Sequence, residues 1–114
     1  MNPRNTQTRL EDILKALGNI YDVRRLLTKY PHEELLPEIV YNSTIYSLII
    51  IGEAIKHIDP KYRNRYPHIK WKELISLRNE LTHEYFAVNL DYLDTLIDEH
   101  LREFAQEIAK ILEN

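Results

Sequence analysis

Apolar side chains recur at intervals of three and four residues along most of the chain, which is the period of an amphipathic α-helix. The first stripe predicts a helix from about Thr8 to Lys29, and Pro31 should prevent it from continuing. Pro37 is suited to the first turn of a second helix, which we expect to reach about Ile58. The first stripe consists of Leu10, Ile13, Leu14, Leu17, Ile20, Tyr21 and Leu27.

The centre of the second helix, residues 45–51, is nearly all apolar, so this helix should be the most buried one. Gly52 follows inside the same helix, where a glycine indicates either the close approach of another helix or a tolerated weak point. Glu53 and His57 lie four residues apart and therefore share a helix face. A single pair of this kind predicts a surface contact rather than a metal site.

Three further helical segments are expected downstream. They are a single turn between Pro60 and Pro67, a helix from Trp71 that ends between His83 and Phe86, and a helix from Leu90 to about Leu112. Asn89 is a good N-cap for the last of them. Four long helices joined by short links predict an all-α fold, an antiparallel bundle of four to five helices.

The composition agrees with a single globular domain over residues 1–114. The chain is 44% hydrophobic and 29% charged, and its two glycines are too few for the turns of an all-β domain. It has no cysteine, which excludes disulfides and thiolate metal sites. It also has no apolar run of membrane-spanning length and no signal-peptide core near Met1, so we expect a cytoplasmic protein without a membrane span.

Charge is distributed unevenly along the chain, although the net charge is only −3. A basic segment leads into the helix that begins at Trp71, and the segment from Asp91 onward is acidic. The basic segment predicts a local track for a polyanion such as RNA, although a solvated charged face would have the same sequence. The candidate RNA-binding cations are Lys56, Lys61, Arg63, Arg65, Lys70 and Lys72.

The third long helix carries polar side chains that a core does not need, namely Arg78, Asn79, His83 and, just beyond, Tyr85. The planar guanidinium of arginine suits phosphate, and histidine is the side chain best suited to moving protons near neutral pH. Arg78 and His83 are therefore a minimal set for cleaving a phosphodiester without a metal. The alternative is that Arg78 pairs with Glu84 or solvent and that His83 caps the helix end.

Arg78 and His83 are five residues apart, which is about 140° around an α-helix. They converge on one ligand only if the helix ends near His83 or if a second copy of the chain supplies the other half. RNA carries its own nucleophile, the 2′-hydroxyl, so Arg78 would bind the phosphate and His83 would transfer the proton. Asn79 would orient the imidazole or the substrate. The expected product is a 2′,3′-cyclic phosphate, and DNA should survive.

The same helix also carries one pair of residues with the spacing of metal ligands. Glu80 and His83 match one Glu-x-x-His unit of di-iron bundles, but those bundles need a second such unit, which this chain lacks. No glycine-rich phosphate loop occurs either. The sequence therefore predicts no metal and no cofactor. The remaining histidines, which do not pair with each other at helical spacing, are His32, His57, His68 and His100.

The segment 66–86, which contains the spacing R-x4-H-x-Y from Arg78 to Tyr85, resembles the HepT-type toxins of the HEPN superfamily. Residues 51–54 (IGEA) and 10–14 (LEDIL) resemble the same family, so the resemblance covers most of the chain in order. It implies an all-α HEPN-like bundle, a homodimer and metal-independent RNase activity on an RNA substrate. It also implies a partner, a nucleotidyltransferase (MntA-like) antitoxin.

Tyr85 has three interpretations. The resemblance implies that it is the residue to which the antitoxin attaches AMP, whereas a tyrosine beside a basic cleft can also stack a base or pack between helices. Two other functions remain open for the whole chain: a non-catalytic helical partner of a minimal nucleotidyltransferase, and a plain dimeric scaffold. Glu84, next to His83, adds a negative charge close to the expected phosphate site.

Overall fold

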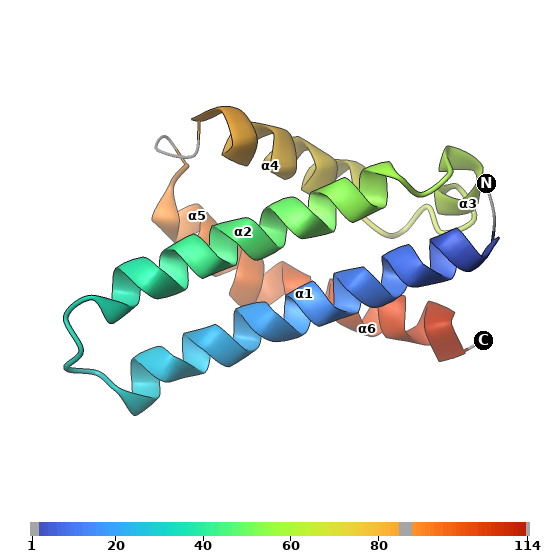
Figure 1. Ribbon diagram of the computed structural model, residues 1–114. Helices are drawn as coiled ribbons and strands as arrows, with labels where there is room; N and C mark the ends of the chain where they lie inside the picture. The colour runs from blue at the N-terminus through green and yellow to red at the C-terminus, as the bar shows by residue number, and fades with distance from the viewer. Residues whose placement is uncertain (1–2, 85–87, 114) are drawn as a thin grey trace.

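The computed structural model describes residues 3–84 and 88–113, and the side chains from Thr6 onward within those ranges. In this part of the chain the protein is a bundle of α-helices without a β-strand, as the hydrophobic period predicts (Figure 1). None of the described helices is both long enough and apolar enough to cross a membrane.

Six α-helices and one π-helical stretch make up the bundle. The bounds are α1 (Pro3–Lys29), α2 (Leu36–Lys56), α3 (Pro60–Arg63), α4 (Trp71–Glu84), α5 (Leu90–Thr95), the π-helical stretch Leu96–His100, and α6 (Leu101–Glu113). Helix α1 begins earlier than predicted because Thr6, which is buried, lies four residues before Leu10 and extends the same face by one turn. The predicted end at Lys29 is confirmed, and α4 is helical through Glu84, the last described residue before position 88.

Helix α2 packs against both α1 and α4. Helices α1 and α2 lie side by side and antiparallel, α4 packs on α2, and α6 packs on α1 (Figure 1). Within the described chain α2 contributes more buried side chains than any other helix, which confirms its prediction as the most buried one. Its outer face is an exception, because Ile39 and Tyr46 are exposed there.

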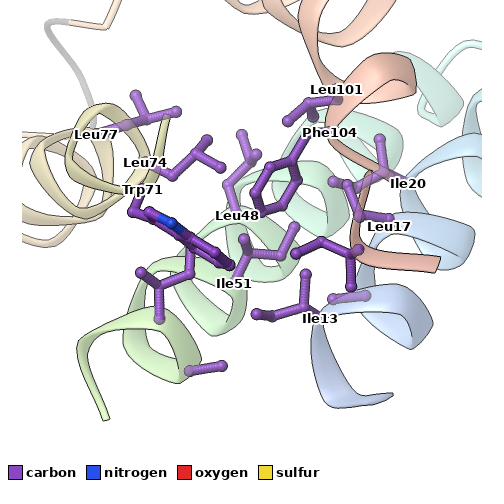
Figure 2. Packing of buried hydrophobic residues seen from close by; sticks show 14 of the residues in the cluster. Ile13, Leu17, Ile20, Leu48, Ile51, Trp71, Leu74, Leu77, Leu101 and Phe104 are labelled. Carbon is purple, nitrogen blue, oxygen red and sulfur yellow. The ribbon is translucent and has the colours of Figure 1, made fainter. Parts of the chain in front are cut away.

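The core is one continuous cluster of aliphatic side chains with two aromatic rings at its centre (Figure 2). Trp71, at the start of α4, meets Phe104 of α6 edge to face, with ring centroids 6.0 Å apart. Its indole Nε1 donates to the carbonyl of Tyr66 at 3.2 Å, so the polar edge of the ring is satisfied. Burial of this kind fixes the start of α4, and therefore the register of the residues that follow.

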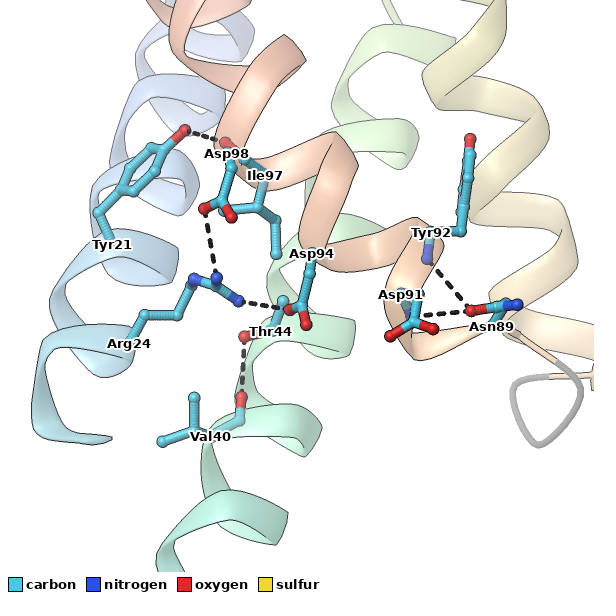
Figure 3. Close-up of polar contacts among 10 residues, drawn as sticks. All are labelled: Tyr21, Arg24, Val40, Thr44, Asn89, Asp91, Tyr92, Asp94, Ile97 and Asp98. Carbon is cyan, nitrogen blue, oxygen red and sulfur yellow. Dashed lines mark hydrogen bonds and ion pairs between the residues drawn. The ribbon is translucent and has the colours of Figure 1, made fainter. Parts of the chain in front are cut away.

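The last helical segment departs from the predicted uninterrupted helix, because a π-helical stretch separates α5 from α6. The hydroxyl of Tyr21 donates to the carbonyl of Ile97 inside that stretch at 2.9 Å, and burial raises the pKa of this phenol (Figure 3). Arg24 binds Asp94 at 3.0 Å and Asp98 at 3.3 Å. These contacts tie α1 to α5 and to the π-helical stretch that follows it.

The predicted N-cap of the last segment is confirmed. The amide oxygen of Asn89 accepts from the backbone N–H of Asp91 at 2.8 Å and from that of Tyr92 at 3.2 Å (Figure 3). Both donors belong to the first turn of α5 and have no partner within the helix. Asn89 therefore fixes where the chain becomes helical again after α4.

Candidate active site

Gly52 marks a close approach of α2 and α4. A β-carbon at this position would overlap the Cβ of Arg78 and lie 3.0 Å from the carbonyl oxygen of Leu74. The predicted close approach is thus confirmed, and it brings the backbone of α2 directly against the base of the Arg78 side chain. Gly18, in α1, has no neighbour of this kind within 4 Å.

The side chain of Arg78 extends from this crossing, and its guanidinium makes two polar contacts. Its Nη2 lies 2.9 Å from Oε2 of Glu53 on α2, and its Nη1 donates to the amide oxygen of Asn79 at 2.9 Å. The side chain is 22% exposed, and its Nε is buried without a hydrogen-bond partner in the described structure. The alternative partner expected from the sequence, Glu84, is therefore wrong: the acid that pairs with Arg78 comes from α2.

Glu53 uses both carboxylate oxygens. Oε2 faces Arg78 and is shielded from solvent, while Oε1 lies 3.1 Å from Nε2 of His57 one turn further along α2. The hydrogen bond from His57 lowers the pKa of Glu53, as do the charges of Arg78 and Lys56, whereas partial burial acts in the opposite direction. The predicted surface contact between Glu53 and His57 is confirmed, and it extends to Arg78.

The lowered pKa of Glu53 predicts a pH dependence of stability that unfolding experiments can test. A carboxyl whose pKa is depressed in the folded state stabilises the protein above its unfolded-state pKa, and this contribution disappears as the pH falls through the folded-state value. We expect Glu53→Gln to lower the urea midpoint at pH 7 and to lower it progressively less below about pH 4. Glu38→Gln, on the exposed first turn of α2, is the control, and an effect of Glu53→Gln that is constant with pH would contradict the prediction.

His83 lies near the end of α4, and its side chain is exposed. Because α4 is helical through Glu84, Arg78 and His83 both belong to it and remain about 140° apart around its axis. Arg78 faces α2, whereas His83 faces solvent on the side away from the core leucines. The two side chains therefore do not converge within one copy of the chain.

The other motif residues are placed as follows. Asn79 directs its amide oxygen at Arg78 rather than at the imidazole of His83, and its backbone carbonyl accepts from the hydroxyl of Thr82 at 3.0 Å. Asn79 thus orients the arginine in this structure. Tyr85 lies outside the described residues.

The basic segment is only partly gathered into one place. A groove of about 620 Å³ between α3 and the first turn of α4 brings together Arg63, Lys70 and Lys72, with Glu73 as its acidic member. Arg65 instead lies over the ring of Tyr62, 5.6 Å from its centroid. The other two candidate cations, Lys56 and Lys61, are also exposed and do not line this groove.

Two of the histidines lie beside acidic side chains. His57 contacts Glu53, and Nε2 of His68 lies 2.9 Å from Oε2 of Glu107. Over residues 3–84 and 88–113, no group of three or more histidine or carboxylate side chains is arranged to hold a metal ion. The residue that sequence reasoning missed is Glu53 as the partner of Arg78. Its position next to the close-approach glycine was the available signal.

Comparison with known families gives this arrangement a context. The sequence model of the family described as "Ribonuclease HepT-like" matches residues 13–111. The chain belongs to the HepT-like ribonuclease family. The match of the HepT-like family includes Gly52, Glu53, Arg78 and His83, so the α2–α4 crossing and both motif residues lie inside it.

Three relatives of this HepT-like chain match it over nearly its whole length. It is 28% identical to "Putative RNase MJ1380" of Methanocaldococcus jannaschii, over 95% of this chain and 97% of that protein. It is 32% identical to "Putative RNase MJ1216" of the same organism, over 100% of this chain and 93% of that protein. It is 29% identical to "Probable ribonuclease HepT" of Thermococcus cleftensis, over 95% of this chain and 96% of that protein. No solved structure gives a significant match.

Proposed function

We propose that this endoribonuclease is metal-independent and acts as the toxin of a toxin–antitoxin pair. The observation that carries the proposal is the fixed guanidinium of Arg78 within the R-x4-H spacing of a HepT-like ribonuclease. Arg78 is a permanent cation with two anchored nitrogens, and His83 is an exposed proton carrier on the same helix. Together they supply what RNA transesterification needs.

In the proposed reaction, the 2′-hydroxyl of the RNA attacks the adjacent phosphorus and the bond to the 5′-oxygen breaks. Arg78 binds the non-bridging oxygens, on which negative charge builds up. His83 takes the proton of the 2′-hydroxyl or returns one to the departing 5′-oxygen. The products are a 2′,3′-cyclic phosphate and a 5′-hydroxyl, and no step consumes water or needs a metal.

The position of the two side chains supports a homodimer as part of this proposal. Because Arg78 and His83 point in different directions, we assign them to one cleft formed by two copies of the chain, with α4 near the dimer axis. The outer face of α2 supports this assignment, since Leu35, Ile39 and Tyr46 are 70%, 58% and 67% exposed there. Their spacing places them on the side of α2 that leads to Glu53.

The experiment that tests the activity uses the purified chain and a labelled RNA in the presence of chelator. We expect cleavage to persist, to leave a 2′,3′-cyclic phosphate, and to stop when the residue at the cut carries a 2′-deoxy or 2′-O-methyl group. Expression should arrest growth, and His83→Ala should abolish the arrest. Growth arrest that survives His83→Ala, or a chain that never cuts RNA, would instead favour the non-catalytic partner of a nucleotidyltransferase.

The proposed antitoxin is a nucleotidyltransferase that transfers AMP to Tyr85. Each AMP adds a phosphodiester with about one negative charge at neutral pH, two residues from His83 in the sequence. That charge would compete with the substrate phosphate for Arg78, and the adenine would fill the cleft. Modification would therefore inhibit by charge and bulk together, without unfolding the bundle.

Tyr85→Phe is expected to remain toxic but to escape the antitoxin, because the phenyl ring is kept and only the acceptor oxygen is lost. The measurement is co-expression with a nucleotidyltransferase of the proposed antitoxin type, followed by mass spectrometry of the intact toxin. Tyr30→Phe, which removes the hydroxyl of an exposed tyrosine just beyond the end of α1, is the matched control. An AMP-sized mass increase that persists in Tyr85→Phe would place the modification elsewhere.

A further inference from the structure

We propose that Glu53 is a positioning residue that holds Arg78 ready for the RNA phosphate, and that His57 in turn fixes Glu53. The inference rests on the proposed function, because it assigns phosphate binding to Arg78. It adds Glu53 of α2 and His57, the C-cap of that helix, to a site whose Arg78 and His83 both lie on α4. Neither residue needs to touch the substrate, since each acts through the next.

The contacts form one continuous chain across the two helices. Nε2 of His57 lies 3.1 Å from Oε1 of Glu53, Oε2 of Glu53 lies 2.9 Å from Nη2 of Arg78, and Nη1 of Arg78 donates to Asn79 at 2.9 Å. A carboxylate only accepts hydrogen bonds, so His57 must present an N–H at Nε2. Gly52 makes the chain possible, because any side chain there would occupy the space of the Arg78 stem.

The remaining donors of Arg78 show what this arrangement leaves for a substrate. A guanidinium has five N–H groups. Nη1 donates one N–H to Asn79, the N–H of Nε is buried, and Nη2 lies 2.9 Å from Oε2 of Glu53 as an ion pair without a hydrogen bond. Each terminal nitrogen therefore keeps at least one N–H for a substrate, which is the number needed to bind two oxygens of a phosphate side by side.

Fixing the guanidinium in advance matters because a free arginine side chain occupies many rotamers. Ordering it at the moment of binding would weaken the complex, whereas a pre-ordered donor pair costs nothing further when the phosphate arrives. The charges that face Glu53 are Arg78 from α4 and His57 and Lys56 from its own helix. All of them favour an ionised Glu53, so the carboxylate is present as an acceptor at neutral pH.

The test is a double-mutant cycle on RNA binding, measured with a labelled 2′-O-methyl RNA that cannot be cleaved. The four proteins are the parent, Glu53→Ala, Arg78→Ala and the double variant, and circular dichroism with thermal melts confirms that each is folded. We expect Glu53→Ala to weaken binding about tenfold in the parent and to change nothing in the Arg78→Ala background. Cleavage of ordinary RNA should fall with Glu53→Ala by a similar factor.

Conservative variants separate positioning from charge. Glu53→Gln keeps the length and one acceptor oxygen, so it should recover most of the loss, whereas Glu53→Asp is one methylene shorter and should not. His57→Gln keeps a hydrogen-bond donor for Glu53 and should bind RNA like the parent. His57→Ala should lose less RNA affinity than Glu53→Ala. His32→Ala, an exposed histidine between α1 and α2, is the control for removing an imidazole.

Each other result overturns the inference. Tighter binding of Glu53→Ala in both backgrounds would mean that the carboxylate only repels phosphate. An equal loss in both backgrounds would mean that Glu53 acts on the fold and not through Arg78. If Arg78→Ala alone leaves binding and cleavage unchanged, the proposed site fails, and this outcome is recognised without any Glu53 variant.

Discussion

Alanine at Arg78 or at His83 is expected to lower RNA cleavage by at least about a hundredfold while leaving the helical bundle folded. Arg78→Ala removes the phosphate-binding cation, and His83→Ala removes the proton carrier. Neither side chain belongs to the apolar core, since Arg78 lies at the α2–α4 crossing and His83 is exposed. Cleavage rates of the purified variants, with circular dichroism as the control for folding, provide the measurement.

A mixture of the two inactive chains tests how the site is assembled. If Arg78 of one copy works with His83 of the other, a dimer of one Arg78→Ala chain and one His83→Ala chain has one intact site and one doubly damaged site. Co-expression of the two chains in equal amounts should then restore roughly a quarter of the parent activity, since half of the dimers are mixed. If each copy used its own pair, every site would carry a lesion and the mixture would stay inactive.

Gly52→Ala is expected to destabilise the fold by about 1–3 kcal/mol and to abolish most of the cleavage activity. Its added methyl group would overlap the stem of Arg78 and press on the carbonyl of Leu74, and neither atom is at the flexible end of a side chain. The two helices must separate locally, which moves Arg78 away from Glu53. Urea unfolding and the cleavage assay on the same preparation measure both effects.

Gly18→Ala is the matched control for this prediction. Gly18 is also a glycine inside a helix, but it is exposed and nothing lies within 4 Å of where its β-carbon would be. Alanine there should raise stability by about 0.5–1 kcal/mol through helix propensity alone, with unchanged cleavage. If the two substitutions had the same effect on stability, the close approach at Gly52 would not be the cause.

The hydrophobic period was sufficient to predict the long helices of the fold. Each of these helices must bury one apolar stripe, and the stripes are long and regular. Pro31 and Asn89 correctly predicted the end of α1 at Lys29 and the N-cap of α5. A proline and a capping side chain act through local sterics and hydrogen bonds, which the sequence alone shows. The π-helical stretch was missed. Its contact with Tyr21 involves a residue 76 positions away in the sequence, which no local pattern encodes.

The sequence names candidate residues for the site but not the contacts between them. The chemistry of Arg78 and His83 can be read from their types, and Gly52 signalled a helix crossing. Which acid reaches Arg78 depends on the register between α2 and α4, and this register is set by core packing around Trp71 and Leu74. The sequence alone offered Glu84 or solvent as the alternative partner of Arg78, whereas packing supplies Glu53.

The arrangement of the chain ends has a practical consequence for all of these experiments. The start of α1 and the end of α6 lie together at one end of the bundle, and the His83 end of α4 lies at the other (Figure 1). A purification tag or a fluorescent protein fused to either end is thus attached far from the exposed histidine. If the proposed dimer forms, differently tagged copies can be co-purified in sequence, and the mixed dimers can then be assayed as a pure species.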